Sequence, residues 1–121
     1  MGETRMTDVR HEVSTQGEMS VLAIAGRLDG TRSGPLGEQW ARMPFEGHLR
    51  IVLDLSGLEW IDSSGVGALI SLAKQTRARG GAVKAACLQR QPKEVFRLLR
   101  LEAILETFDT VEEAVARLAT R

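Results

Sequence analysis

The sequence predicts a single α/β domain with one mixed β-sheet, an N-terminal β-hairpin and about four helices. Residues 51–55 are apolar except for Asp54 and show no alternation, which is typical of a strand buried on both faces. Apolar segments of strand length alternate along the chain with segments of helical periodicity. At 121 residues, the chain is long enough to build one hydrophobic core without disulfides or metals.

The first half of the chain is expected to form a hairpin, a helix and the central strand. Residues 8–13 alternate apolar and polar side chains, and residues 19–25 form a second apolar segment after a turn-rich stretch. Residues 31–42 have helical spacing of their large apolar residues, and we expect a helix that starts near Pro35. A loop then leads into the strand at residues 51–55.

The second half is expected to alternate helices and strands. The residues after Gly65 have apolar side chains at i, i+3, i+4 and i+7, and Gly80 and Gly81 end this helix. The remaining elements are a strand at 82–88, a helix from Pro92 with Val95, Leu98 and Leu99 on one face, a strand at 104–108, and a final helix that begins with Thr110 and Glu113 as a capping box.

Composition and charge exclude several classes of protein. Sixteen basic residues balance sixteen acidic ones, which argues against a nucleic-acid or membrane-surface protein. No stretch approaches the roughly 20 apolar residues that a membrane-spanning helix needs, and the start of the chain lacks the apolar core of a signal peptide. The single cysteine, Cys87, is expected to be a buried thiol. We therefore expect a cytoplasmic domain at residues 8–119 after a flexible N-terminus at residues 1–7.

Motifs of enzymes are incomplete in this sequence. Gly65 and Gly67 begin like a dinucleotide-binding fingerprint, but Ile70 stands at the position of its third glycine. Neither serine after Asp62 has the glycine two positions earlier that a nucleophile elbow requires. The two histidines, His11 and His48, belong to no metal-ligand spacing. We therefore predict no catalytic residue, no metal site and no cofactor.

The remaining polar group follows the central strand, at the start of the next helix. It consists of Asp62, Ser63, Ser64 and Gly65, and Asp29 at the end of the second strand is a possible neighbour. The first turn of a helix has unpaired N–H groups and accepts either a side-chain cap or a bound anion. Spacing alone leaves open whether these serines only cap the helix or carry the function. A cap needs one oxygen, whereas this site offers three polar residues in a row.

The same stretch carries a resemblance to a known family. Residues 52–67, VLDLSGLEWIDSSGVG, resemble the STAS domain of anti-sigma factor antagonists, as do Gly26–Asp29, the glycine pair at 80–81 and residues 92–101, PKEVFRLLRL. Four letters, Asp-Ser-Ser-Gly, are a weak match alone. Between a buried strand and an amphipathic helix, with the flanking matches, they are specific. The resemblance covers roughly residues 8–119 and keeps the order of elements given above.

The resemblance implies a binding protein without catalytic activity. In that family the unphosphorylated antagonist binds an anti-sigma factor, which is a serine kinase, and thereby releases a sigma factor. The kinase phosphorylates the first serine of the motif, here Ser63, and a metal-dependent serine phosphatase reverses the reaction. Ser64 is the second choice of acceptor, and Asp29, Asp62 and Gly65 would complete the partner-binding surface.

Two other classes remain open at this point. A STAS scaffold or accessory subunit, of the stressosome or lipid-transport type, would bind its partner without a phospho-switch. A small hydrolase would need activity that depends on Ser63 or Ser64, and the sequence offers no evident base for either. If Ser64 caps the helix, Ser63 is available to the kinase, and this is the arrangement that we expect.

Overall fold

The computed structural model describes residues 10–16, 19–30 and 50–119 of the chain. The described strands and helices follow one another in the order β1 Arg10–Gln16, β2 Met19–Leu28, β3 Arg50–Ile61, α2 Ser63–Ala78, β4 Ala82–Ala86, α3 Arg90–Leu98, the 3-10 helix η2 Leu101–Ala103, β5 Thr107–Phe108 and α4 Val111–Ala119. The expected helix at residues 31–42, the loop at Gly17 and the segment 1–7 lie outside the described residues.

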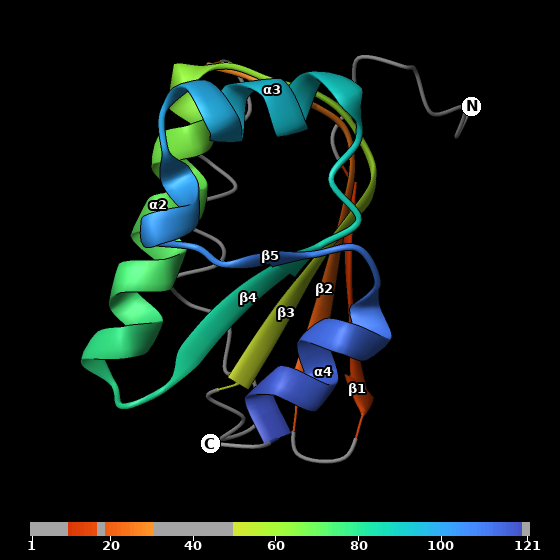
Figure 1. Ribbon diagram of the computed structural model, residues 1–121, viewed down its shortest axis with the longest axis vertical. Helices are drawn as coiled ribbons and strands as arrows, with labels where there is room; N and C mark the ends of the chain where they lie inside the picture. Colours follow the sequence, from red (N-terminus) through yellow and green to blue (C-terminus); the bar gives the residue numbers. More distant parts are fainter. Residues whose placement is uncertain (1–9, 17–18, 31–49, 120–121) are drawn as a thin grey trace.

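The strands form one mixed sheet in the order β1-β2-β3-β4-β5. The β1–β2 pair is antiparallel and the other three pairs are parallel, so the predicted hairpin and mixed sheet are confirmed. In Figure 1, α2 runs alongside the sheet, α3 crosses the end at which β3 stops, and α4 lies apart from both. Because β2, β3 and β4 are parallel, their carboxyl ends lie at one edge of the sheet.

The central strand has helices on both faces, as its continuous apolar sequence predicts. Ile51 and Leu53 point into a core with α2 and α3, whereas Val52 between them points into a second core with α4. These three side chains are at most 1% exposed. Because successive strand residues face opposite sides, α2 and α3 must cover one face of the sheet and α4 the other.

The central strand is longer than the sequence indicates. The expected strand ended at residue 55, and this bound is wrong, because β3 continues to Ile61 and pairs with β2 as far as Leu28. The pairing contains two register shifts, and a Cβ on Gly57 would lie 2.8 Å from the Cβ of Ala25. A glycine is therefore needed at position 57, where a side chain would collide with Ala25 of β2.

Three details of the second half also differ from the predictions. Helix α3 begins at Arg90, and its buried residues are Pro92 and Phe96, whereas Leu98 and Leu99 are 65% and 53% exposed. Strand β5 covers only Thr107–Phe108, because residues 104–106 leave η2 through a turn and do not form ladder pairs with β4. The thiol of Cys87 is half-buried rather than buried, at a residue with φ of 66°. Burial, and then the nearby charge of Asp54, raise the pKa of this thiol above its ordinary value.

The predicted capping box of α4 is confirmed. The N–H of Glu113 donates to Oγ1 of Thr110 at 3.1 Å, and the N–H of Thr110 donates to Oε1 of Glu113 at 3.3 Å. Ala114 and Leu118 are buried, which confirms the amphipathic pattern of this helix.

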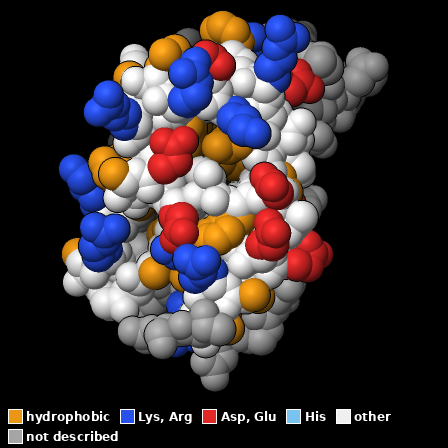
Figure 2. Space-filling view, in the orientation of Figure 1, with side chains coloured by type: hydrophobic (Ala, Val, Ile, Leu, Met, Phe, Trp, Pro, Cys, Tyr) orange, Lys and Arg blue, Asp and Glu red, His pale blue; other side chains and the backbone are white. Residues whose placement is uncertain are grey.

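Charge is spread unevenly over the surface despite the net charge of zero. Figure 2 shows Lys and Arg side chains gathered on the side of α2 and α3, with several Asp and Glu side chains toward α4. A partner that approaches α2 and α3 therefore meets a different field from one that approaches α4.

Candidate functional site

The site is built where β3 passes into α2. Strand β3 ends at Ile61, Asp62 has an extended backbone (φ −111°, ψ −173°), and α2 begins at Ser63. Oδ1 of Asp62 accepts a hydrogen bond from the N–H of Gly65 at 3.0 Å. This is the geometry of a helix N-cap, in which a side-chain oxygen satisfies an otherwise unpaired N–H of the first turn.

The same carboxylate also fixes α2 to the end of β2. Oδ2 of Asp62 accepts from the N–H of Gly30 at 3.2 Å, and the N–H of Asp62 donates to the carbonyl oxygen of Leu28 at 3.3 Å. Asp29 is half-buried and lies between these two contacts in the chain. The structure thus brings the segment of Asp29 next to Asp62, across more than 30 positions of sequence.

Both serines are exposed on the first turn of α2. The expectation that Ser64 caps the helix is wrong, because the cap is Asp62. Oγ of Ser64 lies 3.5 Å from the position that a Cβ on Gly30 would occupy, so this hydroxyl faces the end of β2. Ser63 is the first residue of the helix, and its hydroxyl is not required for capping.

Gly65 is buried beneath the first turn of α2. A Cβ at this position would lie 2.3 Å from the carbonyl oxygen of Leu28 and 2.7 Å from Cγ1 of Ile61. The absence of a side chain lets the helix sit directly on the ends of β2 and β3. Gly65 therefore serves the site by letting the first turn of α2 pack against Leu28 and Ile61.

Two contacts beside this site could not be predicted from the sequence. The carboxamide of Gln91 in α3 accepts from the N–H of Ile61 at 2.9 Å and donates to its carbonyl oxygen at 3.0 Å. Trp60 is 39% exposed, and the guanidinium carbon of Arg27 lies 4.8 Å from the centre of its ring. Neither contact has a signal in the sequence, because the paired residues are about 30 positions apart and follow no motif.

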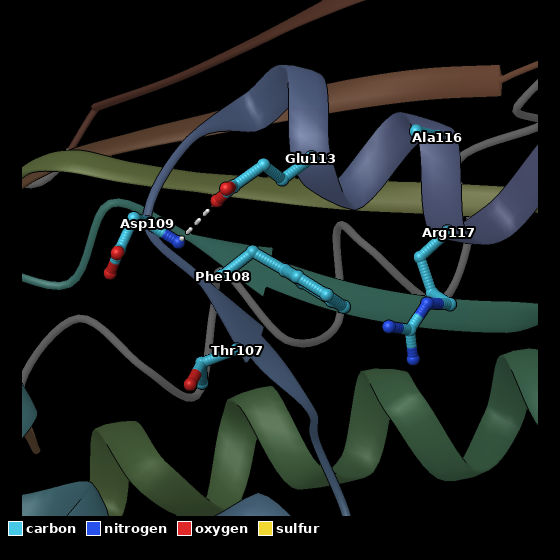
Figure 3. A pocket seen from close by; sticks show the side chains of 6 residues that line it. All are labelled: Thr107, Phe108, Asp109, Glu113, Ala116 and Arg117. Atoms are coloured by element: carbon cyan, nitrogen blue, oxygen red, sulfur yellow. Dashed lines mark hydrogen bonds between the residues drawn. The ribbon is translucent and has the colours of Figure 1, made fainter.

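Away from this site, a hollow of about 520 Å³ lies beside β5 and α4. In Figure 3, Phe108 and Arg117 line it, and the Glu113 side chain turns back to the N–H of Asp109, which donates to Oε1 at 3.2 Å. Arg117 lies over the Phe108 ring and donates to Glu106 at 3.2 Å. Since α4 packs on the opposite face of the sheet from α2, this hollow is separate from the Ser63 site.

Within the described residues, no group of three His, Cys, Asp or Glu side chains is arranged to hold a metal ion. Of the helices in that part of the chain, none has the length and apolarity to span a bilayer.

Known proteins resemble this chain in both sequence and fold. The family model of the STAS domain matches residues 10–114. A relative from Thermotoga maritima, assigned as an anti-sigma factor antagonist, is 30% identical over 97 residues, which are 78% of this chain and 86% of the relative.

Two solved structures have the same fold. An anti-sigma factor antagonist from Mycobacterium paratuberculosis superposes with a TM-score of 0.82 at 17% identity, over 93% of this chain and 96% of its own. The Bacillus cell fate determinant SpoIIAA in its phosphorylated form superposes with a TM-score of 0.66 at 23% identity, over 89% of this chain and 98% of its own. With the family match over most of its length, the chain belongs to the STAS domain family.

Proposed function

We propose that this protein is an anti-sigma factor antagonist that binds an anti-sigma serine kinase while unphosphorylated, frees a sigma factor, and is switched off by phosphorylation of Ser63. The observation that carries the proposal is the position of Ser63 as the exposed first residue of α2, where Asp62 already provides the cap. The relative from T. maritima and the phosphorylated form of SpoIIAA support the same reading. The protein acts by binding, without turnover of its own, and a metal-dependent serine phosphatase resets it.

The geometry favours Ser63 over Ser64 as the acceptor. The Ser64 hydroxyl faces Gly30, so a phosphate at this position would have the end of β2 beside it. Ser63 lies between Asp62 and Ser64 on the exposed start of the helix. A kinase therefore reaches the Ser63 hydroxyl with less obstruction from the described part of the chain.

The electrostatics of the site explain how one phosphate switches binding. A phosphoserine carries about −1.5 to −2 charges, and at about 6 Å from the Asp62 carboxylate it is repelled by about 1 kcal/mol in water, and by more where water is excluded. In the free protein the N-terminus of α2 offsets part of this repulsion. A docked partner removes water from the phosphate, and a desolvated phosphate without a cationic partner is costly. Phosphorylation should therefore weaken binding more than it destabilises the fold.

The first experiment tests whether an anti-sigma-type serine kinase phosphorylates Ser63. The protein is incubated with each anti-sigma-type kinase of the same genome, and the intact mass is measured by mass spectrometry. We expect the mass of one added phosphate in the wild-type protein and in Ser64→Ala, and none in Ser63→Ala. Retention of the phosphate in Ser63→Ala together with its loss in Ser64→Ala would move the acceptor to Ser64.

Binding to the same kinase separates a switch from a scaffold. Ser63→Ala should bind the kinase as the wild type does, and Ser63→Asp should bind at least about tenfold more weakly, which is about 1.4 kcal/mol. Because the Ser63 hydroxyl does not cap α2, the free energy of unfolding of both variants should lie within about 0.5 kcal/mol of the wild-type value. Equal binding by the two variants would favour a STAS scaffold that holds its partner without regard to phosphorylation.

A further inference from the structure

The side chain of Gln91 takes the place of a neighbouring strand at the end of β3. Its carboxamide both accepts from the N–H and donates to the carbonyl oxygen of one residue, Ile61, at 2.9 and 3.0 Å. A side-chain amide has the same donor and acceptor as a peptide group, so this pair reproduces one step of a β-ladder. Both distances lie in the range of well-formed hydrogen bonds.

The sheet leaves this position open for Gln91. Strand β4 pairs with β3 only as far as Asp54 and Ala86, whereas β3 continues to Ile61 along β2. In a parallel ladder, the N–H and C=O of one residue point to the same neighbour, and those of the next residue point to the other. The N–H of Asp62 points to β2, where it reaches the carbonyl oxygen of Leu28. The polar groups of Ile61 therefore point away from β2, toward the side that β4 no longer covers.

The turn that carries Ser63 is consequently held from three directions. Gln91 holds Ile61 from α3. Leu28, the last residue of β2, and Gly30 just after it hold Asp62 from a second side, and Gly65 holds Asp62 from within α2. Among the described residues, Gln91 provides the hydrogen bonds that come from α3. If these bonds are lost, the backbone at the end of β3 keeps its hydrogen bonds to the β2 side and loses those to α3.

We propose that Gln91 is the positioning residue of the phosphoacceptor turn, and that it keeps the backbone before Asp62 fixed so that Ser63 is presented to the kinase as part of a folded surface. This inference rests on the proposed function. Ser63 is in the first turn of a capped helix, so drawing it into an extended conformation would break the contacts of Asp62. The kinase must therefore accept the serine in its folded position, and correct orientation of the hydroxyl determines the rate of transfer.

The loss of Gln91 should lower kcat of the phosphorylation reaction and leave KM nearly unchanged. Gln91→Met removes both hydrogen bonds while it keeps the length of the side chain. Because the residues that the kinase contacts are chemically unchanged, KM should change by less than about twofold, whereas kcat should fall by about tenfold as the Ser63 hydroxyl loses its orientation. A kinase that unfolds its substrate segment would give the opposite result, with faster phosphorylation of the loosened variant.

Two controls separate positioning from general weakening. Gln89→Met removes a neighbouring glutamine whose Nε2 donates to the carbonyl oxygen of Cys87 at 2.8 Å. Ile51→Val weakens the core at the other end of β3, where Ile51 is 1% exposed. Both should keep the wild-type kcat, even where their thermal midpoints fall as far as that of Gln91→Met.

A measurement that needs no kinase tests whether Gln91 holds the turn. Amide hydrogen exchange, measured by NMR on the full chain, should become at least about tenfold faster at Ile61 and Gly65 in Gln91→Met, relative to amides of α4 in the same sample. Exchange at these two amides that matches the controls would overturn the positioning role, as would an unchanged or increased kcat. If wild-type Ser63 takes no phosphate from any kinase, the proposed function fails instead, and the exchange result decides alone whether Gln91 holds the turn.

Discussion

Replacement of Gly65 by alanine tests how tightly the start of α2 is packed against the sheet. The added Cβ would lie 2.3 Å from the carbonyl oxygen of Leu28, 2.7 Å from Cγ1 of Ile61 and 3.0 Å from Cγ of Leu28. Carbon atoms in contact are normally about 3.5–4.0 Å apart. The closest of the three atoms belongs to the backbone and accepts the hydrogen bond of Asp62, so it cannot move away without loss of that bond. The helix must shift instead.

The size of the effect follows from two opposing terms. Overpacking of a buried position costs about 1–3 kcal/mol, and this clash with backbone belongs at the upper end of that range. Alanine is better than glycine inside a helix by about 1 kcal/mol, which offsets part of the cost. We therefore expect a net loss of about 2 kcal/mol in the free energy of unfolding.

Gly67 provides the matched control on the same helix. It is exposed, and a Cβ at its position would meet nothing within 4 Å. Gly67→Ala should therefore stabilise the protein by about 0.5–1 kcal/mol through helix propensity and the lower entropy of the unfolded chain. The same substitution two positions apart should thus change stability in opposite directions.

Urea unfolding followed by circular dichroism measures both variants. With a slope of about 2 kcal/mol per molar urea, the midpoint of Gly65→Ala should fall by about 1 M, and that of Gly67→Ala should rise by a few tenths. If Gly65→Ala were as stable as Gly67→Ala, the start of α2 would not rest on Leu28 as described, and the placement of Ser63 derived from it would be refuted.

Two further predictions concern charged side chains. Asp62→Ala removes the helix cap and the contact with Gly30, and should lower the free energy of unfolding in urea by about 1–3 kcal/mol. Ser64→Ala should lower it by less than about 0.5 kcal/mol. Equal losses of stability in the two variants would contradict the assignment of Asp62 as the cap. The pKa of Glu106 is lowered from its ordinary value of 4.5, chiefly by the hydrogen bond from Lys84, so its contribution to stability is present above pH 4.5 and is lost as the pH falls through the lowered folded pKa. Lys84→Met should flatten this part of the curve of stability against pH, and an unchanged curve would show that the pair does not control it.

Local patterns in the sequence predicted those elements whose ends are marked by their own residues. Residues 110–113 form the capping box that their letters describe, and Gly80, with φ of 89°, lies at the end of α2. The apolar run at 51–55 is buried on both faces of the sheet, as the absence of alternation indicates. In each case the information lies within a few positions along the chain.

Predictions failed where distant segments decide the structure. Residues 56–61 contain Ser56 and Glu59, which are typical of a turn, but β2 continues beside them and extends the strand, with both of these side chains exposed. Leu98 and Leu99 fit the apolar face of a longer helix. The chain leaves α3 through Arg100, whose φ is 55°, and so places Leu101 in the core instead. A left-handed arginine gives no signal comparable to that of glycine at a helix end.

The polar site shows the same division between local and distant information. Its residues stand out in the sequence, but the contacts that they make depend on partners some 30 positions away. A carboxylate has two oxygens, so Asp62 can cap α2 with one and hold Gly30 with the other, whereas a serine hydroxyl at the cap could accept only at a single oxygen. Because aspartate performs both structural tasks, the hydroxyl of Ser63 has none, and it can be modified without removing any of the hydrogen bonds that hold the turn. The proposed function requires a phosphorylation that is reversible and leaves the fold intact, and a serine beside the cap of a helix meets that requirement better than a serine at the cap itself.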